Sequence, residues 1–72
     1  MAKKGTGEKR KYNRIKEVLE QQERTQTWLS EQIDLDFVTI TRYVNNHRQP
    51  SIEILFEIAK ILKVNAKELL NS

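Results

Sequence analysis

The sequence predicts an all-α domain of five helices, and three observations carry that prediction. Apolar residues recur at the i, i+3, i+4 spacing of a helix face in most segments of the chain. Residues that cap helices stand just before several of these segments. Only residues 36–45 have the composition of a strand, and a strand without a partner leaves its backbone groups unpaired. Seventy-two residues suffice for one domain with a thin core.

Charge is distributed unevenly along the chain. Residues 1–16 carry seven basic side chains and one acidic side chain, a net charge of +6. The remaining residues carry six basic and nine acidic side chains, a net charge of −3. We therefore expect residues 1–11 to form a disordered basic N-terminal arm and residues 12–72 to form the folded domain. The arm either contacts a polyanionic partner or only increases solubility.

The composition excludes several kinds of site. The chain has no cysteine and one histidine, so we expect no disulfide, no metal site and no cofactor. No apolar run approaches the ~20 residues that span a bilayer, and no apolar segment of a signal peptide follows the basic start. We therefore expect no membrane contact and a cytoplasmic location. The sequence has no Ser/Cys–His pair, glycine-rich phosphate loop or ligand cluster, so we do not expect an enzyme.

Two helices are predicted before residue 34. Residues 13–22 have one apolar face, and Asn13 is a suitable N-cap for them. Residues 26–33 follow Thr25, which can cap a second helix. The side chains expected to face the core from these helices are Ile15, Val18, Leu19, Leu29 and Ile33, with Trp28 beside them.

Residues 36–45 are rich in β-branched and aromatic side chains, which strands favour. At strand spacing neither face is cleanly apolar, whereas at helix spacing Ile40, Tyr43 and Val44 form one stripe. A helix loses at most ~0.7 kcal/mol for each of these residues, and burial of one large side chain gains roughly 1.5–3 kcal/mol. We therefore predict a helix, capped by Asp36, against the local propensity.

Two further helices are predicted after Pro50. Residues 52–62 follow Ser51 as N-cap, and residues 66–70 follow Asn65 with a glutamate three residues on, which is a capping-box spacing. The expected inward stripe of the first of these helices comprises Ile52, Leu55, Phe56, Ala59 and Leu62. A second stripe comprises Ile54, Ile58 and Ile61. The last helix is expected to close the core with Leu69 and Leu70.

Residues 26–45 meet the requirements of a helix-turn-helix. Ser30 is a small residue where the two helices would touch, and Asp34 stands where the turn needs a left-handed backbone. Ile40 and Tyr43 would anchor the second helix. The residues then left outward are Phe37, Val38, Thr39 and Arg42, while Thr41 would face the first helix of the pair.

At this point residues 13–70 resemble the Cro/cI-type, XRE-like helix-turn-helix family. The most specific marks are "TQTWLSEQI", the "RQPS" after the third helix, and "IAKIL-V" leading to "ELL". The resemblance implies a compact five-helix, lambda-repressor-like domain that binds double-stranded DNA as a transcriptional regulator, with a repressor as the expected form. Family members often carry glycine at three positions that are here Glu23, Asp34 and Asn46.

Four residues of the third helix are candidates for base contacts: Arg42, Thr39, Val38 and Phe37. An outward arginine in the major groove can bind guanine O6 and N7 together, for ~1–3 kcal/mol of discrimination. Val38 and Phe37 can pack on thymine methyl groups. Three of the four have an alternative: Arg42 pairs with a nearby carboxylate, Thr39 is an ordinary surface residue, and Phe37 belongs to the core.

Six residues are candidates for phosphate contacts: Thr25, Gln26, Asn46, His47, Arg48 and Arg14. The N–H groups of a helix N-terminus and a side-chain amide can bind a phosphate, which favours Gln26. The three residues after the third helix can hold the next phosphates along the backbone. Trp28 either packs on the first helix or contacts a sugar.

The partners expected are double-stranded DNA and a second copy of the chain. Ile54 and Ile61 widen the apolar surface beyond the need of one small core, which suggests a homodimer through the C-terminal helices. Such a dimer would place two recognition helices ~34 Å apart. These isoleucines could equally cover a satellite core. An alternative function is a protein-interaction module that uses the exposed Phe37 and Val38 and binds no DNA.

Overall fold

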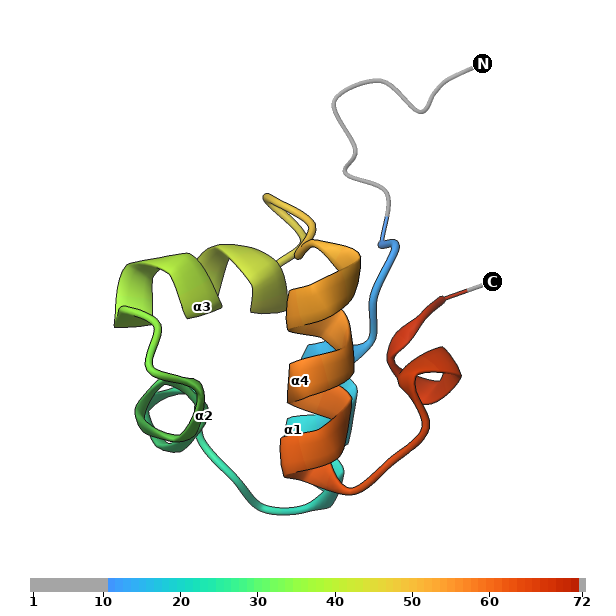
Figure 1. The fold of residues 1–72 in the computed structure, drawn as a ribbon, viewed down its shortest axis with the longest axis horizontal. Coiled ribbons are helices and arrows are strands. Elements are labelled where there is room, and N and C mark those ends of the chain that lie inside the picture. The colour runs from blue at the N-terminus through green and yellow to red at the C-terminus, as the bar shows by residue number, and fades with distance from the viewer. Residues whose placement is uncertain (1–10, 72) are drawn as a thin grey trace.

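The structure is a computed structural model that describes residues 11–71. Within that range it has no strand, and the predicted all-α class is confirmed (Figure 1). The elements are α1 (Ile15–Gln21), α2 (Gln26–Ile33), α3 (Phe37–Val44), α4 (Ile52–Leu62) and the 3-10 turn η1 (Ala66–Leu69). The predicted disordered arm lies, apart from Lys11, outside the described residues.

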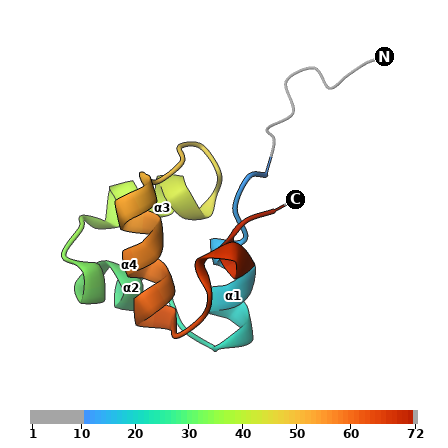
Figure 2. The same ribbon diagram turned by 45° about the vertical axis from the view of Figure 1, so that its right-hand side comes forward.

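The helices surround one core. α2 packs against α3 and α4, α1 packs against α3, and η1 packs against α4. Figures 1 and 2 show α4 between the α2–α3 pair and the segment that holds η1. The two ends of the described chain lie side by side, because Arg14 N–H donates to Leu69 O at 2.7 Å and Asn71 N–H donates to Tyr12 O at 2.8 Å. An antiparallel bridge between Asn13 and Leu70 completes this junction.

Three predicted N-caps are confirmed. The side-chain oxygens of Thr25, Asp36 and Ser51 each accept a hydrogen bond from the backbone N–H three residues further on, at 3.0, 3.2 and 3.2 Å. Each cap satisfies an N–H that the helix itself leaves unpaired. The starts of α2, α3 and α4 therefore follow from short-range sequence.

The predicted cap of α1 was wrong by one residue. Arg14 occupies the N-cap position and makes no side-chain cap bond. Asn13 still accepts a hydrogen bond from Ile15 N–H, at 3.2 Å, but its amide nitrogen is used elsewhere. Because its amide nitrogen bonds to a residue 30 positions away, Asn13 lies in the core and precedes the helix.

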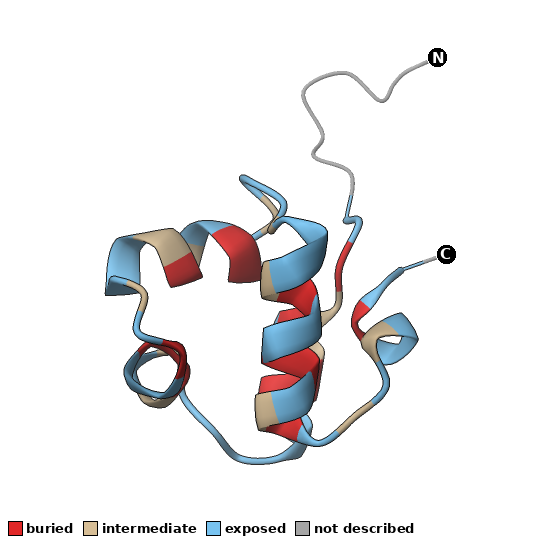
Figure 3. Cartoon of the chain, in the orientation of Figure 1, coloured by how far each residue is buried: buried red, intermediate tan, exposed pale blue. Residues whose placement is uncertain are grey.

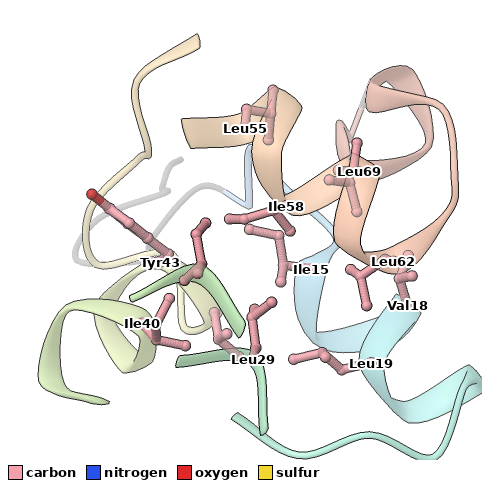
Figure 4. Close-up of a cluster of buried hydrophobic side chains, with 13 residues drawn as sticks. Ile15, Val18, Leu19, Leu29, Ile40, Tyr43, Leu55, Ile58, Leu62 and Leu69 are labelled. Carbon is pink, nitrogen blue, oxygen red and sulfur yellow. The ribbon is translucent and has the colours of Figure 1, made fainter. Parts of the chain in front are cut away.

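The core is formed by one side of each helix (Figure 3). Its fully buried aliphatic side chains gather at the centre in Figure 4, where the hydroxyl of Tyr43 points away from them. The buried apolar residues are Ile15, Val18, Leu19, Leu29, Ile33, Ile40, Tyr43, Val44, Leu55, Ile58, Ala59, Leu62 and Leu69. The β-rich segment is thus a helix, and its burial outweighs its propensity, as the sequence predicts.

The predicted fifth helix is a single 3-10 turn. Asn65 makes no side-chain cap bond, and the turn closes through a hydrogen bond from Glu68 N–H to Asn65 O at 2.9 Å. Leu69 is buried as predicted, but Leu70 has an extended backbone and is 48% exposed. The bridge with Asn13 extends the chain here, so no further helical turn forms.

The inward stripe predicted for α4 was wrong at two positions. Ile52 is 69% exposed and Phe56 is 59% exposed. The buried side of α4 follows the i, i+3, i+4, i+7 spacing of Leu55, Ile58, Ala59 and Leu62. Ile52 and Phe56 lie on one flank of that stripe, and Ile54 and Ile61 lie on the other, partly buried against the core. The excess apolar surface therefore lies on the flank opposite to the predicted one.

Among residues 11–71, four residues other than glycine have a left-handed backbone. They are Glu23, Asp34, Asn46 and Lys63, with φ between 56° and 62°. The left-handed turn predicted at Asp34 is confirmed, and the other two family glycine positions adopt the same conformation. Asp34 ends α2 with its N–H donating to Ser30 O at 3.1 Å.

Candidate nucleic-acid interface

The outer side of α3 presents a stripe of exposed residues. Val38, Arg42 and Asn45 follow one another at i, i+4 and i+7, so they share a face of the helix. Val38 is 55% exposed, and Phe37 beside it is 50% exposed, so Phe37 does not belong to the core. Ile40, one of the anchors, is fully buried on the opposite side. Of the predicted base-contacting residues, three are thus presented to solvent.

Thr39 is held by the cap of its own helix. Its hydroxyl donates to Asp36 Oδ1 at 2.6 Å, and its N–H donates to Asp36 Oδ2 at 3.2 Å. The Thr39 hydroxyl, together with its backbone N–H, lowers the pKa of the Asp36 carboxyl below its usual value. Since the hydroxyl hydrogen is used here, Thr39 could offer a base only its methyl group or its oxygen lone pairs.

A side-chain bond links the start of α2 to the middle of α3. Thr41 Oγ1 donates to Gln26 Oε1 at 2.9 Å, which confirms that Thr41 faces α2. This contact brings Gln26, a predicted phosphate contact, to the flank of the exposed stripe. Because Oε1 accepts the Thr41 hydroxyl, Nε2 is the atom that Gln26 can direct to a phosphate.

The loop after α3 is anchored to the helix through one carbonyl group. Arg42 O accepts hydrogen bonds from His47 N–H at 2.9 Å and from Arg48 N–H at 3.2 Å. Both side chains are exposed, so this loop presents a second basic group beyond the end of α3. Arg48 therefore lies next to the same turn of the helix that carries Arg42.

Asn46 holds the loop to the start of the described chain. Its Oδ1 accepts hydrogen bonds from Tyr12 N–H at 2.9 Å, Asn13 N–H at 3.0 Å and Gln49 Nε2 at 3.2 Å. Its Nδ2 donates to Asn13 O at 3.2 Å. The side chain predicted to reach a phosphate is thus occupied by these internal bonds.

Asn13 completes this network from the other side. It is 1% exposed, and its Nδ2 donates to Tyr43 O at 3.0 Å and to Gln49 Oε1 at 2.9 Å. We call Asn13, Asn46 and Gln49 the amide clamp. Arg14, another predicted phosphate contact, directly follows Asn13, so the clamp places its backbone beside the α3–α4 loop.

Thr25 and Trp28 have defined structural roles. The hydroxyl oxygen of Thr25 caps α2, as described above. Trp28 is partly buried against the core, and the guanidinium carbon of Arg24 lies 4.5 Å from its ring centroid. This distance fits a cation–π contact.

Sequence reasoning missed two members of this region. Asn45 extends the exposed stripe by one turn, and its i+7 spacing from Val38 could have indicated it. Gln49 belongs to the amide clamp, and no local pattern indicates a bond from Gln49 to Asn13, 36 residues away in the sequence.

Other kinds of site find no support within residues 11–71. No group of three or more His, Cys, Asp or Glu side chains in this part of the chain could hold a metal ion. None of the helices described there is both long enough and apolar enough to cross a membrane.

The comparisons with known proteins agree with this geometry. A family model described as helix-turn-helix matches residues 15–69. The crystal structure of a candidate DNA-binding protein from Bacteroides fragilis is similar, with a TM-score of 0.81 and 42% sequence identity. That likeness covers 83% of this chain and 97% of the other. A search of curated proteins gave no match. The chain belongs to the helix-turn-helix family, of the Cro/cI, XRE-like type.

Proposed function

We propose that this protein is a sequence-specific DNA-binding regulator of transcription that acts as a repressor. In this proposal α3 enters the major groove of double-stranded DNA and covers an operator. The main observation behind this proposal is the exposed stripe of α3, which is followed by a basic loop. Hydrogen bonds fix the helix to α2 on one side and to this loop on the other. Membership of the helix-turn-helix family and the likeness to a candidate DNA-binding protein support it.

Arg42 is the proposed base-reading residue. It is exposed in the middle of the stripe, where a guanidinium can bind guanine O6 and N7 together. Val38 and Phe37 would contact thymine methyl groups beside it. Asn45, one turn further along, would reach the next base or phosphate.

The proposed phosphate contacts flank α3 on two sides. Gln26 Nε2 and the N–H groups at the start of α2 would bind one phosphate. Arg48 and His47 would bind another, past the end of α3. Arg14 would contact the backbone from the start of α1. Asn46 is proposed to support these contacts from behind, through the amide clamp.

The test begins with a selection of bound sites from random double-stranded DNA. Arg42→Ala should weaken binding to the selected site by roughly 5- to 150-fold, which corresponds to ~1–3 kcal/mol. It should weaken binding to unrelated DNA much less, because base contacts supply the specificity. Arg24→Ala is the matched control: it removes the same charge from an arginine that stacks on Trp28, outside α3. Equal effects of the two substitutions would exclude base reading by Arg42.

Arg48→Ala should behave differently from Arg42→Ala. A lost phosphate contact weakens binding to all sequences alike and reduces the slope of log K against log salt by about 1. Fluorescence anisotropy at several salt concentrations measures both quantities. An unchanged slope would remove Arg48 from the set of phosphate contacts.

A protein-interaction module remains the second candidate, and the half exposure of Phe37 and Val38 favours it. Reversing the charges of Arg42 and Arg48 to glutamate separates the two functions. DNA binding that is absent in the unmodified protein, or unchanged in this double variant, would favour the interaction module.

A further inference from the structure

A hollow of about 500 Å³ lies between α2, the end of α1 and the end of α4. This volume falls within the ~300–1,000 Å³ that is usual for sites that bind a ligand. Among the residues that line it are Arg24, Trp28, Lys60, Ile61 and Lys63. None of the lining residues, all of which belong to residues 11–71, is acidic. We call this site the basic hollow.

Hydrogen bonds fix the walls of the basic hollow relative to one another. Gln22 Nε2, at the end of α1, donates to Leu62 O, at the end of α4, at 2.8 Å. Arg24 N–H donates to Leu19 O at 2.9 Å, so the connection from α1 to α2 has a defined direction. The hollow is therefore formed by the packed fold, and its lining residues are held together before any partner binds.

Three cations line the basic hollow without an acidic partner. They are Arg24, Lys60 and Lys63, and all three side chains are exposed. The one salt bridge found within residues 11–71 joins Lys11 to Glu17, away from this site. Lys60 and Lys63 stand at the C-terminal end of α4, whose dipole is equivalent to about half a negative charge. That dipole offsets only part of the charge of three cations, so the hollow keeps an excess of positive charge.

This gathering of cations contrasts with the rest of the folded domain. After residue 16 the chain has six basic and nine acidic side chains. Two of the six basic residues, Arg42 and Arg48, belong to α3 and the loop that follows it. Three of the remaining four line the basic hollow. A local excess of positive charge on an otherwise acidic body attracts an anionic partner to that one place.

The basic hollow also offers apolar surface. Trp28 and Ile61 line it and are only partly buried against the core. The guanidinium of Arg24 lies over the indole ring of Trp28, 4.5 Å from its centroid, and covers one face of the ring. A nucleobase stacked on Trp28 would have to displace Arg24 from that face. An aliphatic side chain needs no open ring face, because it can pack against Ile61 and the part of the indole left exposed.

We propose that the basic hollow is a docking site for an acidic segment of a partner protein, in which an apolar side chain is flanked by aspartate or glutamate. The apolar side chain would pack against Trp28 and Ile61. The flanking carboxylates would pair with Arg24, Lys60 and Lys63. A nucleic-acid backbone offers the negative charge but no aliphatic side chain, so it would leave the apolar part of the hollow uncovered.

A second copy of the chain suits the basic hollow less well than an acidic segment does. A two-fold axis through the hollow would place three cations of one copy against the same three cations of the other. Ile61, one of the two isoleucines predicted to form a homodimer contact, lies among these like charges. Charge complementarity therefore favours a partner of different composition.

The two lysines of the basic hollow lie away from the exposed stripe of α3. Figures 1 and 2 show the end of α4 on the side of the domain opposite to α3. A segment docked against the end of α4 would thus leave the exposed stripe open. The inference goes beyond the proposed function and does not depend on it, because it assigns a second binding surface to the same domain.

The experiment titrates the full chain with three synthetic peptides and follows the fluorescence of Trp28, the only tryptophan in the sequence. In the first peptide a leucine is flanked by glutamates. The second has serine in place of the leucine, and the third has lysines in place of the glutamates. The first peptide should change the Trp28 emission and bind roughly tenfold or more tightly than either of the others, because it alone supplies both carboxylates and an apolar side chain.

The double variant Lys60→Gln/Lys63→Gln locates the binding site. It should weaken binding of the first peptide roughly tenfold or more, through the loss of two charge-assisted contacts. Lys16→Gln/Lys67→Gln is the matched control: it removes the same charge from two exposed lysines that do not line the hollow, and it should leave the affinity unchanged. Glutamine favours helices, so circular dichroism should show that both double variants are folded. Equal losses in the two double variants would mean attraction by net charge alone and would overturn the docking site.

Duplex DNA separates this proposal from the proposed function. Arg42→Ala should lose specific duplex binding and keep the peptide affinity, whereas Lys60→Gln/Lys63→Gln should do the reverse. A chain that binds the first peptide but no duplex would sink the regulator and leave the docking site standing. A first peptide that leaves the Trp28 emission unchanged up to about 1 mM would overturn the docking site. An unrelated duplex that displaces the peptide, and fails to bind Lys60→Gln/Lys63→Gln, would assign the hollow to nucleic acid and overturn it as well.

Discussion

The two connections that flank α3 are held in place by different means. The α2–α3 turn depends on its own backbone and on a cap: Asp34 takes the left-handed conformation and Asp36 accepts two hydrogen bonds from Thr39. The α3–α4 loop depends on the amide clamp, whose bonds from Asn46 and Gln49 reach back 33 to 36 residues. The start of α3 is thus set locally, and its end is set by the fold.

This difference explains how the exposed stripe of α3 is oriented relative to the rest of the domain. A cap fixes where a helix begins, but it does not fix the helix against the rest of the domain. The amide clamp ties the end of α3 to the segment before α1, and the Thr41–Gln26 bond ties its middle to α2. The direction of Arg42 therefore depends on side chains that lie far from it in the sequence.

The largest expected effect comes from removing the buried member of the clamp. Asn13→Ala deletes three hydrogen bonds and leaves buried partners unsatisfied, so it should destabilise the protein by about 2–4 kcal/mol. Urea unfolding followed by circular dichroism measures this loss. A change below ~0.5 kcal/mol would show that the α3–α4 loop does not depend on the long-range bonds of the amide clamp.

Glycine substitutions at two of the four left-handed positions, Asn46 and Asp34, should differ in their effect on stability. Asn46→Gly permits the backbone conformation but removes four side-chain hydrogen bonds, for a net loss of about 1–2 kcal/mol. Asp34→Gly removes a side chain that makes no hydrogen bond within residues 11–71, and should be neutral or stabilising by up to ~1 kcal/mol. Thermal unfolding of both variants gives the comparison directly. Effects of the same sign and size would contradict it.

A smaller loss is expected where a single local cap is removed. Thr25→Ala takes away the bond to Trp28 N–H and should lower stability by ~1 kcal/mol, whereas Thr25→Ser should retain most of it. Thr27→Ala, two residues further along α2, is the control for helix propensity. If both alanine variants lose equally, the Thr25 cap contributes nothing of its own.

The smallest expected effect is on the stability of the protein at acid pH. The pKa of Asp36 is lowered in the folded protein, chiefly by the Thr39 hydroxyl, so its ionised form is stabilised by folding. The contribution is fully present above the ordinary carboxyl pKa of 3.8 and is lost as the pH falls through the lowered folded value. Stability measured between pH 2 and pH 6 should fall less steeply for Thr39→Val than for the unmodified chain. Identical slopes would mean that the hydroxyl does not govern this pKa.

Sequence reasoning succeeded where the determining contacts are short-range. The caps Thr25, Asp36 and Ser51 act over three residues, and the stripe of Ile40 and Tyr43 acts over one helical turn, so the sequence pattern contains them. For the same reason the exposure of Val38 and Arg42 could be predicted from helix spacing alone.

The predictions from sequence failed where a residue forms hydrogen bonds or packing contacts with a distant part of the chain. Asparagine is a common helix cap, yet the Asn13 amide donates hydrogen bonds to Tyr43 and Gln49, and no local spacing indicates these bonds. The flanks of α4 are equally apolar in sequence, and only the packing decides that Ile54 is partly covered and Ile52 is not. The use of the Thr39 hydroxyl by Asp36 likewise depends on a rotamer that the sequence does not specify.

The junction of the two chain ends has a consequence for how the fold could be re-engineered. Since Tyr12 and Asn71 are joined by a hydrogen bond of 2.8 Å, a short peptide could link residue 11 to residue 71 without moving any helix. New termini could then be opened at the exposed, left-handed Glu23 between α1 and α2. Such a circular permutant would start with α2 and α3, so the order of synthesis could be changed while the architecture is kept.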